Sequence, residues 1–133
     1  MKVFVDSYAF IGWINTLDSS HAIVNNFMAT YRGRFITTEW ILMELADGLS
    51  HRSVRAKTLE LIRRVRTNRL FEIVPYGTPI YQDGYDLFAA RPDKDWSLTD
   101  CISFAVMDQR GLTDALTGDH HFEQAGFRAI FKV

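Results

Sequence analysis

The sequence contains a single cysteine, Cys101, among its 133 residues, so no disulfide can form within the chain. The lack of a disulfide framework is typical of a reducing compartment, and we expect a cytoplasmic protein. The chain also lacks an excess of positive charge, because 15 lysines and arginines against 16 aspartates and glutamates give a net charge of −1. Any nucleic-acid partner must therefore be held by a local basic patch rather than by the charge of the whole chain.

Long hydrophobic runs are missing as well. The most apolar stretch, VFVDSYAFIGWI at residues 3–14, contains Asp6, is preceded by only one basic residue, Lys2, and is followed by no small-residue cleavage pattern. We interpret it as a buried strand that passes into a helix, not as a targeting segment. No other segment approaches the length needed to cross a membrane, so we expect no membrane partner.

Apolar residues are nevertheless abundant enough to fill one core. Hydrophobic residues make up 47% of the chain and aromatic residues 14%. The length is close to the commonest size of a single domain. Because the sequence contains no internal repeat, low-complexity tract or linker, we expect one domain over residues 1–133.

Short apolar runs alternate with amphipathic segments along the chain. The runs predict strands at residues 2–5, 34–37, 71–74, 112–117 and 127–133. Asp114 inside the fourth run is unusual for a buried strand. The other segments predict helices at about residues 7–16, 21–31, 39–50, 52–68, 79–90 and 97–111. This alternation predicts an α/β fold with a parallel sheet covered by helices on both faces.

Four acidic residues are candidates for a functional site. In such folds, ligands bind beyond the carboxyl ends of the strands. Asp6 follows the first predicted strand and Asp119 the fourth, whereas Asp100 lies in the first turn of a helix and Glu44 in the body of another. The three aspartates could instead be helix caps, since short carboxylates accept the free N–H groups of a first turn. Glu44 has no capping role, and its alternative is a side chain at the rim of the buried face.

The four carboxylates would repel one another if they converged. At about 5 Å and an effective dielectric near 20, each pair costs roughly 3 kcal/mol. The carboxylates must then take up protons or bind a cation. An all-oxygen set of ligands suits a hard ion such as Mg²⁺ or Mn²⁺.

Two adjacent histidines, His120 and His121, directly follow Asp119. A zinc site would require them to act with cysteines or further histidines at ligand spacing, and Cys101 has no cysteine partner. Adjacent histidines on a regular segment are expected to point in different directions. We therefore interpret both as exposed or in contact with a substrate, and expect Asp119 to be the metal ligand.

Four segments resemble the motif blocks of PIN-domain nucleases, in their usual order. They are VFVDSYAFIGWIN, TTEWILMELADGL, DKDWSLTDCISFAVM and TGDHHFEQAGF, and together they span nearly the whole chain. The likeness is strongest to the small single-domain members typified by VapC toxins. The resemblance implies a three-layer α/β/α sandwich with a parallel, roughly five-stranded sheet, and a metal-dependent ribonuclease activity.

The resemblance also implies roles for particular residues. The acidic site of the family corresponds to Asp6, Glu44, Asp100 and Asp119, which would be both catalytic and metal-binding. Hydroxyl positions that support those acids correspond to Ser7, Thr99 and Thr117. A frequent DxxH feature corresponds to Asp18 and His21, and Asp95 is either a further acid at the rim of the site or an ordinary loop residue. The implied partners are an RNA substrate, a second copy of the chain in a homodimer and an antitoxin protein.

An acidic pocket repels RNA, so basic side chains must hold the backbone nearby. One candidate set is on the fourth predicted helix and the other in the loop before Asp100: Arg52, Arg55, Arg63 and Arg66, and Arg91 and Lys94. For most of these arginines a solvated helix face is the competing interpretation.

Three other classes of protein share part of this pattern, and the sequence argues against the first two. Aspartate-nucleophile phosphatases need a second aspartate two residues after the first, where this chain has Tyr8. Receiver-like signalling domains need a phosphoacceptor aspartate after the third strand, where this chain has Pro75, Tyr76 and Gly77. A catalytically silent PIN-like RNA-binding module is compatible with the sequence, and a cleavage assay is needed to separate it from a nuclease.

Overall fold

A computed structural model describes residues 1–132 and contains one five-stranded parallel sheet. The strand order is β3-β2-β1-β4-β5, so the first strand lies in the middle. The strands are β1 (Lys2–Val5), β2 (Arg34–Thr38), β3 (Phe71–Val74), β4 (Asp114–Leu116) and β5 (Arg128–Ala129). The central pair is in register with Val5 opposite Leu116, which puts the residues that follow these strands side by side at the carboxyl edge.

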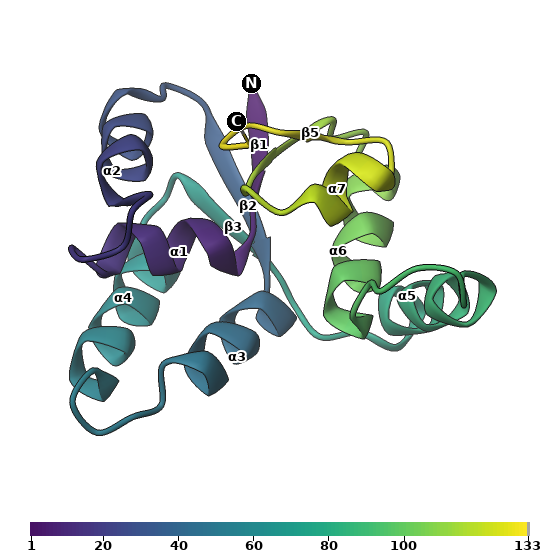
Figure 1. Cartoon of the computed structure of the whole chain (residues 1–133), viewed down its shortest axis with the longest axis horizontal. Coiled ribbons are helices and arrows are strands. Elements are labelled where there is room, and N and C mark those ends of the chain that lie inside the picture. Colours follow the sequence, from purple (N-terminus) through teal and green to yellow (C-terminus); the bar gives the residue numbers. More distant parts are fainter. Residues whose placement is uncertain (133) are drawn as a thin grey trace.

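Helices cover both faces of this sheet and form the outer layers of a three-layer sandwich. They are α1 (Ser7–Ile14), α2 (His21–Thr30), α3 (Glu39–Gly48), α4 (Arg55–Thr67), α5 (Thr78–Ala90), α6 (Leu98–Gln109) and α7 (His120–Gln124). In Figure 1, α1, α2 and α4 lie on one side of the sheet, and α5, α6 and α7 lie on the other. The expected α/β/α architecture with a parallel sheet is confirmed.

Local sequence explains where the helices that carry the acids begin. The Thr38 side chain accepts a hydrogen bond from the N–H of Ile41 and caps α3. Ser97 and Asp100 form a reciprocal capping box at the start of α6. That helix ends at Gln109, and Gly111 two residues later has a φ of 65°, in the left-handed region that glycine adopts without strain.

The last two strands are shorter than the sequence predicted. The fourth was expected at 112–117, but the N–H of Leu112 closes the end of α6 on the carbonyl of Met107, and a turn joins the N–H of Thr117 to Ala115. The fifth was expected at 127–133, but a turn from Ala129 to Lys132 ends it. Residue 133 lies outside the described residues. The short helix α7 was not predicted as a separate element.

The core is built on the central strands. Val3, Phe4 and Val5 of β1 are at most 2% exposed, and α4 buries Thr58, Leu61 and Val65. A buried β1 fixes the position of Asp6 at its end. Within residues 1–132 we find no helix with both the length and the apolar character needed to cross a bilayer.

Candidate active site

Five acids line one cavity at the carboxyl edge of the sheet, and four of them are the predicted metal ligands, each of which occupies the N-cap position of, or belongs to, a different helix. The cavity has a volume of about 390 Å³. Its lining comprises Asp6, Ser7, Tyr8, Ile11, Glu44, Asp95, Ser97, Asp100, Asp119 and His121. We call it the acidic pocket. The structure therefore brings together Asp6, Glu44, Asp100 and Asp119, as their positions in the sequence suggested.

Asp6 is the most buried acid of the pocket, with 5% of its surface exposed. It occupies the N-cap position of α1, yet its side chain caps no backbone N–H. Its Oδ2 instead accepts a 2.8 Å hydrogen bond from the hydroxyl of Thr117. Burial raises the pKa of Asp6 from 3.8 to about 7; the Thr117 hydrogen bond opposes this shift, and the charges of Glu44 and Asp100 add to it.

Glu44 turns toward the other acids rather than toward water. Its Oε1 accepts a 2.6 Å hydrogen bond from the hydroxyl of Ser7, which ties α3 to the first turn of α1. Partial burial raises the pKa of Glu44, the Ser7 hydrogen bond opposes this shift, and Asp100 and Asp119 add to it. The alternative, a glutamate at the rim of the buried face directed at solvent or an arginine, is wrong.

Asp100 and Asp119 cap helices and line the pocket at the same time. Asp100 Oδ2 accepts from the N–H of Ser97 at 3.1 Å and lies 3.2 Å from Nδ1 of His121. Burial is the main cause that raises the pKa of Asp100. Asp119 Oδ1 accepts from the N–H of His121 at 2.9 Å and caps α7. For these two aspartates, the capping and pocket interpretations are therefore not exclusive.

Two of the three supporting hydroxyls are in place. Ser7 contacts Glu44, and Thr117 bridges two acids because its oxygen also accepts from the N–H of Asp119 at 3.1 Å. Among residues 1–132, no hydrogen bond joins Thr99 to a pocket carboxylate, and Thr99 is absent from the lining of the pocket. The structure thus gives no support to the role expected for Thr99.

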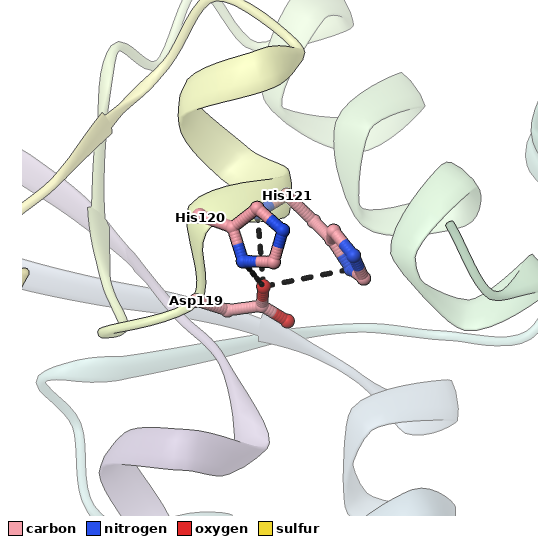
Figure 2. Close-up of side chains that lie close together, drawn as sticks. All are labelled: Asp119, His120 and His121. Atoms are coloured by element: carbon pink, nitrogen blue, oxygen red, sulfur yellow. Dashed lines mark hydrogen bonds and ion pairs between the residues drawn. The ribbon is translucent and has the colours of Figure 1, made fainter. Parts of the chain in front are cut away.

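The adjacent histidines lie close together, contrary to the sequence-based prediction. Both occupy the first turn of α7, and their ring centroids are 4.5 Å apart. Each Nδ1 approaches the same carboxylate oxygen, Asp119 Oδ1, at 3.6 Å for His120 and 3.5 Å for His121 (Figure 2). The sequence analysis interpreted His121 only as exposed or in contact with a substrate, whereas the structure places it in the lining of the acidic pocket; the short helix α7, which was not predicted, determines this position.

The remaining candidates have structural partners or peripheral positions. Asp18 accepts hydrogen bonds from Ser20, and Nδ1 of His21 lies 2.9 Å from the carbonyl oxygen of Gly12, so the DxxH feature links α1 to α2. Asp95 is exposed at the rim of the acidic pocket. On α4, Arg63 pairs with Glu60 and Arg66 with Glu39, as the interpretation of a solvated helix face requires.

The donor set of the acidic pocket fits a divalent cation. Besides Asp95 at its rim, it offers carboxylate oxygens from the four predicted acids, and such oxygens are the ligands that Mg²⁺ and Mn²⁺ prefer. The raised pKa values of three acids are the expected result of burying like charges together. A bound cation would relieve that repulsion.

The fold and the pocket together define an α/β protein with an acidic, cation-compatible site at the carboxyl edge of a parallel sheet. The family model described as PIN domain matches residues 3–128. The chain therefore belongs to the PIN-domain family, and the resemblance found in the sequence is confirmed.

Known relatives cover almost the whole chain. The 23S rRNA-specific endonuclease VapC20 of Mycobacterium tuberculosis is 24% identical over 130 residues, which are 94% of this chain and 95% of the relative. The crystal structure of VapC20, described as a Sarcin-Ricin loop cleaving toxin, matches with a TM-score of 0.86 at 21% identity, over 94% of this chain and 95% of VapC20. FitAcB of Neisseria gonorrhoeae matches with a TM-score of 0.71 at 18% identity, over 97% and 96% of the two chains. A DNA-bound VapBC complex of Salmonella typhimurium matches with a TM-score of 0.69 at 20% identity, over the same shares.

Proposed function

We propose that this protein is an endoribonuclease that hydrolyses phosphodiester bonds of RNA with Mg²⁺ or Mn²⁺ bound in the acidic pocket. The observation that carries the proposal is the convergence of Asp6, Glu44, Asp100 and Asp119 in one cavity. Membership of the PIN family and the likeness to a 23S rRNA-specific endonuclease support RNA as the substrate.

The protein's own residues would hold the site ready for this reaction. Asp6 and Asp100, the more buried carboxylates, are the primary ligands, and Glu44 and Asp119 complete the set or orient the attacking water. A bound divalent ion would supply a water of lowered pKa and would stabilise charge on the phosphate. Ser7 and Thr117 keep the carboxylates in position through the hydrogen bonds described above.

RNA must also be held against the negative charge of the pocket. Arg91 and Lys94 are suited to this, because they lie in the loop that leads to Asp95 and Ser97 of the pocket lining. Their charged groups lie 5.1 and 5.9 Å from the ring centroid of Trp96. The indole N–H of Trp96 donates to Gln124 at 3.0 Å, so the loop is fixed to the end of α7. Arg91 is paired with Asp93 through two hydrogen bonds of 2.9 Å, just as Arg63 and Arg66 are paired with acids, so an RNA phosphate would have to compete with Asp93 for the Arg91 guanidinium.

We further propose that the protein is the toxin of a toxin–antitoxin pair, and that it acts as a homodimer. The description of VapC20 as a toxin and the match to a VapBC complex support the toxin assignment, whereas the homodimer follows from the resemblance to the family alone. Under this proposal, binding of an antitoxin would inhibit cleavage.

The test compares the wild-type protein with Asp100→Asn on cellular RNA in the presence of Mn²⁺, with the cut ends mapped. We expect cleavage to fall by at least about 100-fold, because even partners one step removed from a metal contribute 10–100-fold. An asparagine oxygen still accepts from the N–H of Ser97, so the cap of α6 is retained. The matched control is Asp108→Asn, the same chemical change at an exposed position of the same helix.

Full activity of Asp100→Asn would refute its assignment. Chelation with EDTA should stop cleavage, and addition of Mg²⁺ or Mn²⁺ should restore it. A wild-type protein that binds RNA but leaves it intact with either ion would instead favour the silent RNA-binding module.

A further inference from the structure

We propose that Asp100, Asp119, His120 and His121 form a nitrogen-containing cation subsite that binds a transition-metal ion of the Zn²⁺ or Mn²⁺ type more tightly than Mg²⁺. We call these four residues the histidine corner of the acidic pocket. The inference deepens the proposed function, since it concerns the same pocket, but it is tested without RNA.

The donor atoms of the histidine corner already lie near ligand spacing. One ligand atom from each of Asp119, His120 and His121 lies within 4.8 Å of the others. Nδ1 of His121 is 3.2 Å from Asp100 Oδ2 and 3.5 Å from Asp119 Oδ1. Ligands bound tetrahedrally to zinc at about 2.0 Å lie about 3.3 Å from one another. An ion could therefore replace the contacts between these side chains after small movements.

The backbone that carries the two histidines is well anchored. The N–H of His121 is bonded to Asp119, and the next residue, Phe122, is fully buried against Phe4 and Phe104. The side chain of His121 is 20% exposed, whereas that of His120 is 59% exposed. Figure 2 shows both imidazole rings over the Asp119 carboxylate. We therefore expect His121 to be the stronger ligand and His120 to complete the set of ligands from the solvent side.

Imidazole nitrogens distinguish between the ions that could enter the pocket. Magnesium prefers oxygen ligands in octahedral geometry and keeps several waters, so it gains little from the histidines. Zinc and other first-row transition metals bind imidazole well, and zinc binds most sites of this kind more tightly than manganese does. The carboxylates alone would then serve Mg²⁺, while the histidine corner favours the transition metals.

The test measures Zn²⁺ and Mg²⁺ binding by calorimetry for the wild type, His121→Ala and His120→Ala. The control is His51→Ala, an exposed histidine whose ring contacts the nearby Ser53. We expect Zn²⁺ to bind at least about 10-fold more weakly to His121→Ala, because losing even a residue that only supports a metal ligand typically costs about 10–100-fold in affinity. His120→Ala should show a smaller loss, and Mg²⁺ affinity should change less than twofold in every variant.

A spectroscopic readout tests the ligand type directly. With Mn²⁺ bound to the wild type, pulsed EPR should detect a nitrogen coupling that disappears in His121→Ala. Equal Zn²⁺ affinity in all four proteins, or parallel losses of Zn²⁺ and Mg²⁺ affinity, would overturn the proposal. Thermal unfolding checks that each variant is folded. If His121→Ala does not fold, the Zn²⁺ and Mg²⁺ affinities of His120→Ala, whose changed side chain is exposed, test the proposal instead. A protein that binds zinc through these imidazoles but cleaves no RNA would overturn only the proposed nuclease activity.

Discussion

At the scale of single residues, buried hydroxyl groups hold the acids of the pocket in place. Thr117 is the clearest case, because its fully buried oxygen donates to Asp6 and accepts from the N–H of Asp119. One side chain thus joins the acid after β1 to the acid after β4. Ser7, in the first turn of α1, holds a single acid, because its hydroxyl donates to Glu44.

Replacement of Thr117 by valine tests this bridge while keeping the shape of the side chain. We expect Thr117→Val to lower the free energy of unfolding by about 1–3 kcal/mol, since Asp6 and the Asp119 N–H would each lose a buried partner. Cleavage should fall as well. Thr99→Val is the matched control and should leave both quantities close to wild type. Urea unfolding and an RNA cleavage assay measure the two effects, and equal results for both variants would contradict the bridge.

Sequence reasoning reached the acids but not all of their neighbours. Asp6 and Asp119 could be selected because they follow strands, whose carboxyl ends border the ligand crevice of such a sheet. Asp100 was selected from the first turn of a helix, and Glu44 as a carboxylate on a largely apolar helix. His121 could not be selected in the same way, because its direction depends on a five-residue helix that the sequence pattern did not reveal. Thr99 was expected from the resemblance alone, and a matching position does not determine which way a hydroxyl is held.

At the scale of elements, the pairing of α5 with α6 positions the helix that starts beside the pocket. Gly84 is buried at this contact, where an added Cβ would meet the Cα and N atoms of Ile102 at 2.8 and 2.9 Å. Those are backbone atoms of α6, which cannot move without shifting the helix. Gly84 therefore allows α6, and with it Asp100, to lie where it does.

Gly84→Ala should be destabilising despite the better helix propensity of alanine. The propensity gain is at most about 1 kcal/mol, whereas forcing an extra carbon into a packed contact costs typically about 1–3 kcal/mol or more. Gly48→Ala is the control, because a Cβ at that position meets nothing within 4 Å. Differential scanning calorimetry should show a lower melting temperature for Gly84→Ala alone; an unchanged value would mean that the two helices can separate slightly without loss.

Element prediction succeeded for the first three strands and for the long helices, and failed for the last two strands and for α7. Helices α4 and α6 carry several turns of apolar spacing, and their boundaries were found within a few residues. The strands β4 and β5 have three and two residues, and turns rather than apolar character end them. Such turns depend on hydrogen bonds between neighbouring segments, which a single sequence does not display.

At the scale of the whole molecule, the acidic pocket couples stability to pH. Burial raises the pKa of Asp6 to about 7 and also raises those of Glu44 and Asp100. A carboxyl group with a higher pKa in the folded chain binds protons more strongly there than in the unfolded chain. Its contribution to stability is complete below its ordinary pKa of 3.8 and is lost as pH rises through about 7.

We therefore expect the metal-free protein to lose stability between about pH 4 and pH 7.5, by a few kcal/mol in order of magnitude. A divalent cation should raise the melting temperature, and more at pH 8 than at pH 5, because the deprotonated acids are its ligands. Thermal unfolding across this pH range, with EDTA or with Mn²⁺, measures both effects. Asp6→Asn should flatten the pH dependence; a slope of the same size in that variant would exclude Asp6 as its main source.

Because β1 lies in the middle of the sheet, the acidic pocket can form only late in the folding of the chain. β1 is bonded to β2 on one side and to β4 on the other, so segments more than a hundred residues apart must meet along it. Two of the four acids precede the loop at residues 91–97, and two follow it. In a nascent chain whose β4 has not yet paired with β1, the carboxylates are present but the acidic pocket has not formed. The protein would thus be harmless to the RNA around it until the final strands have joined the sheet.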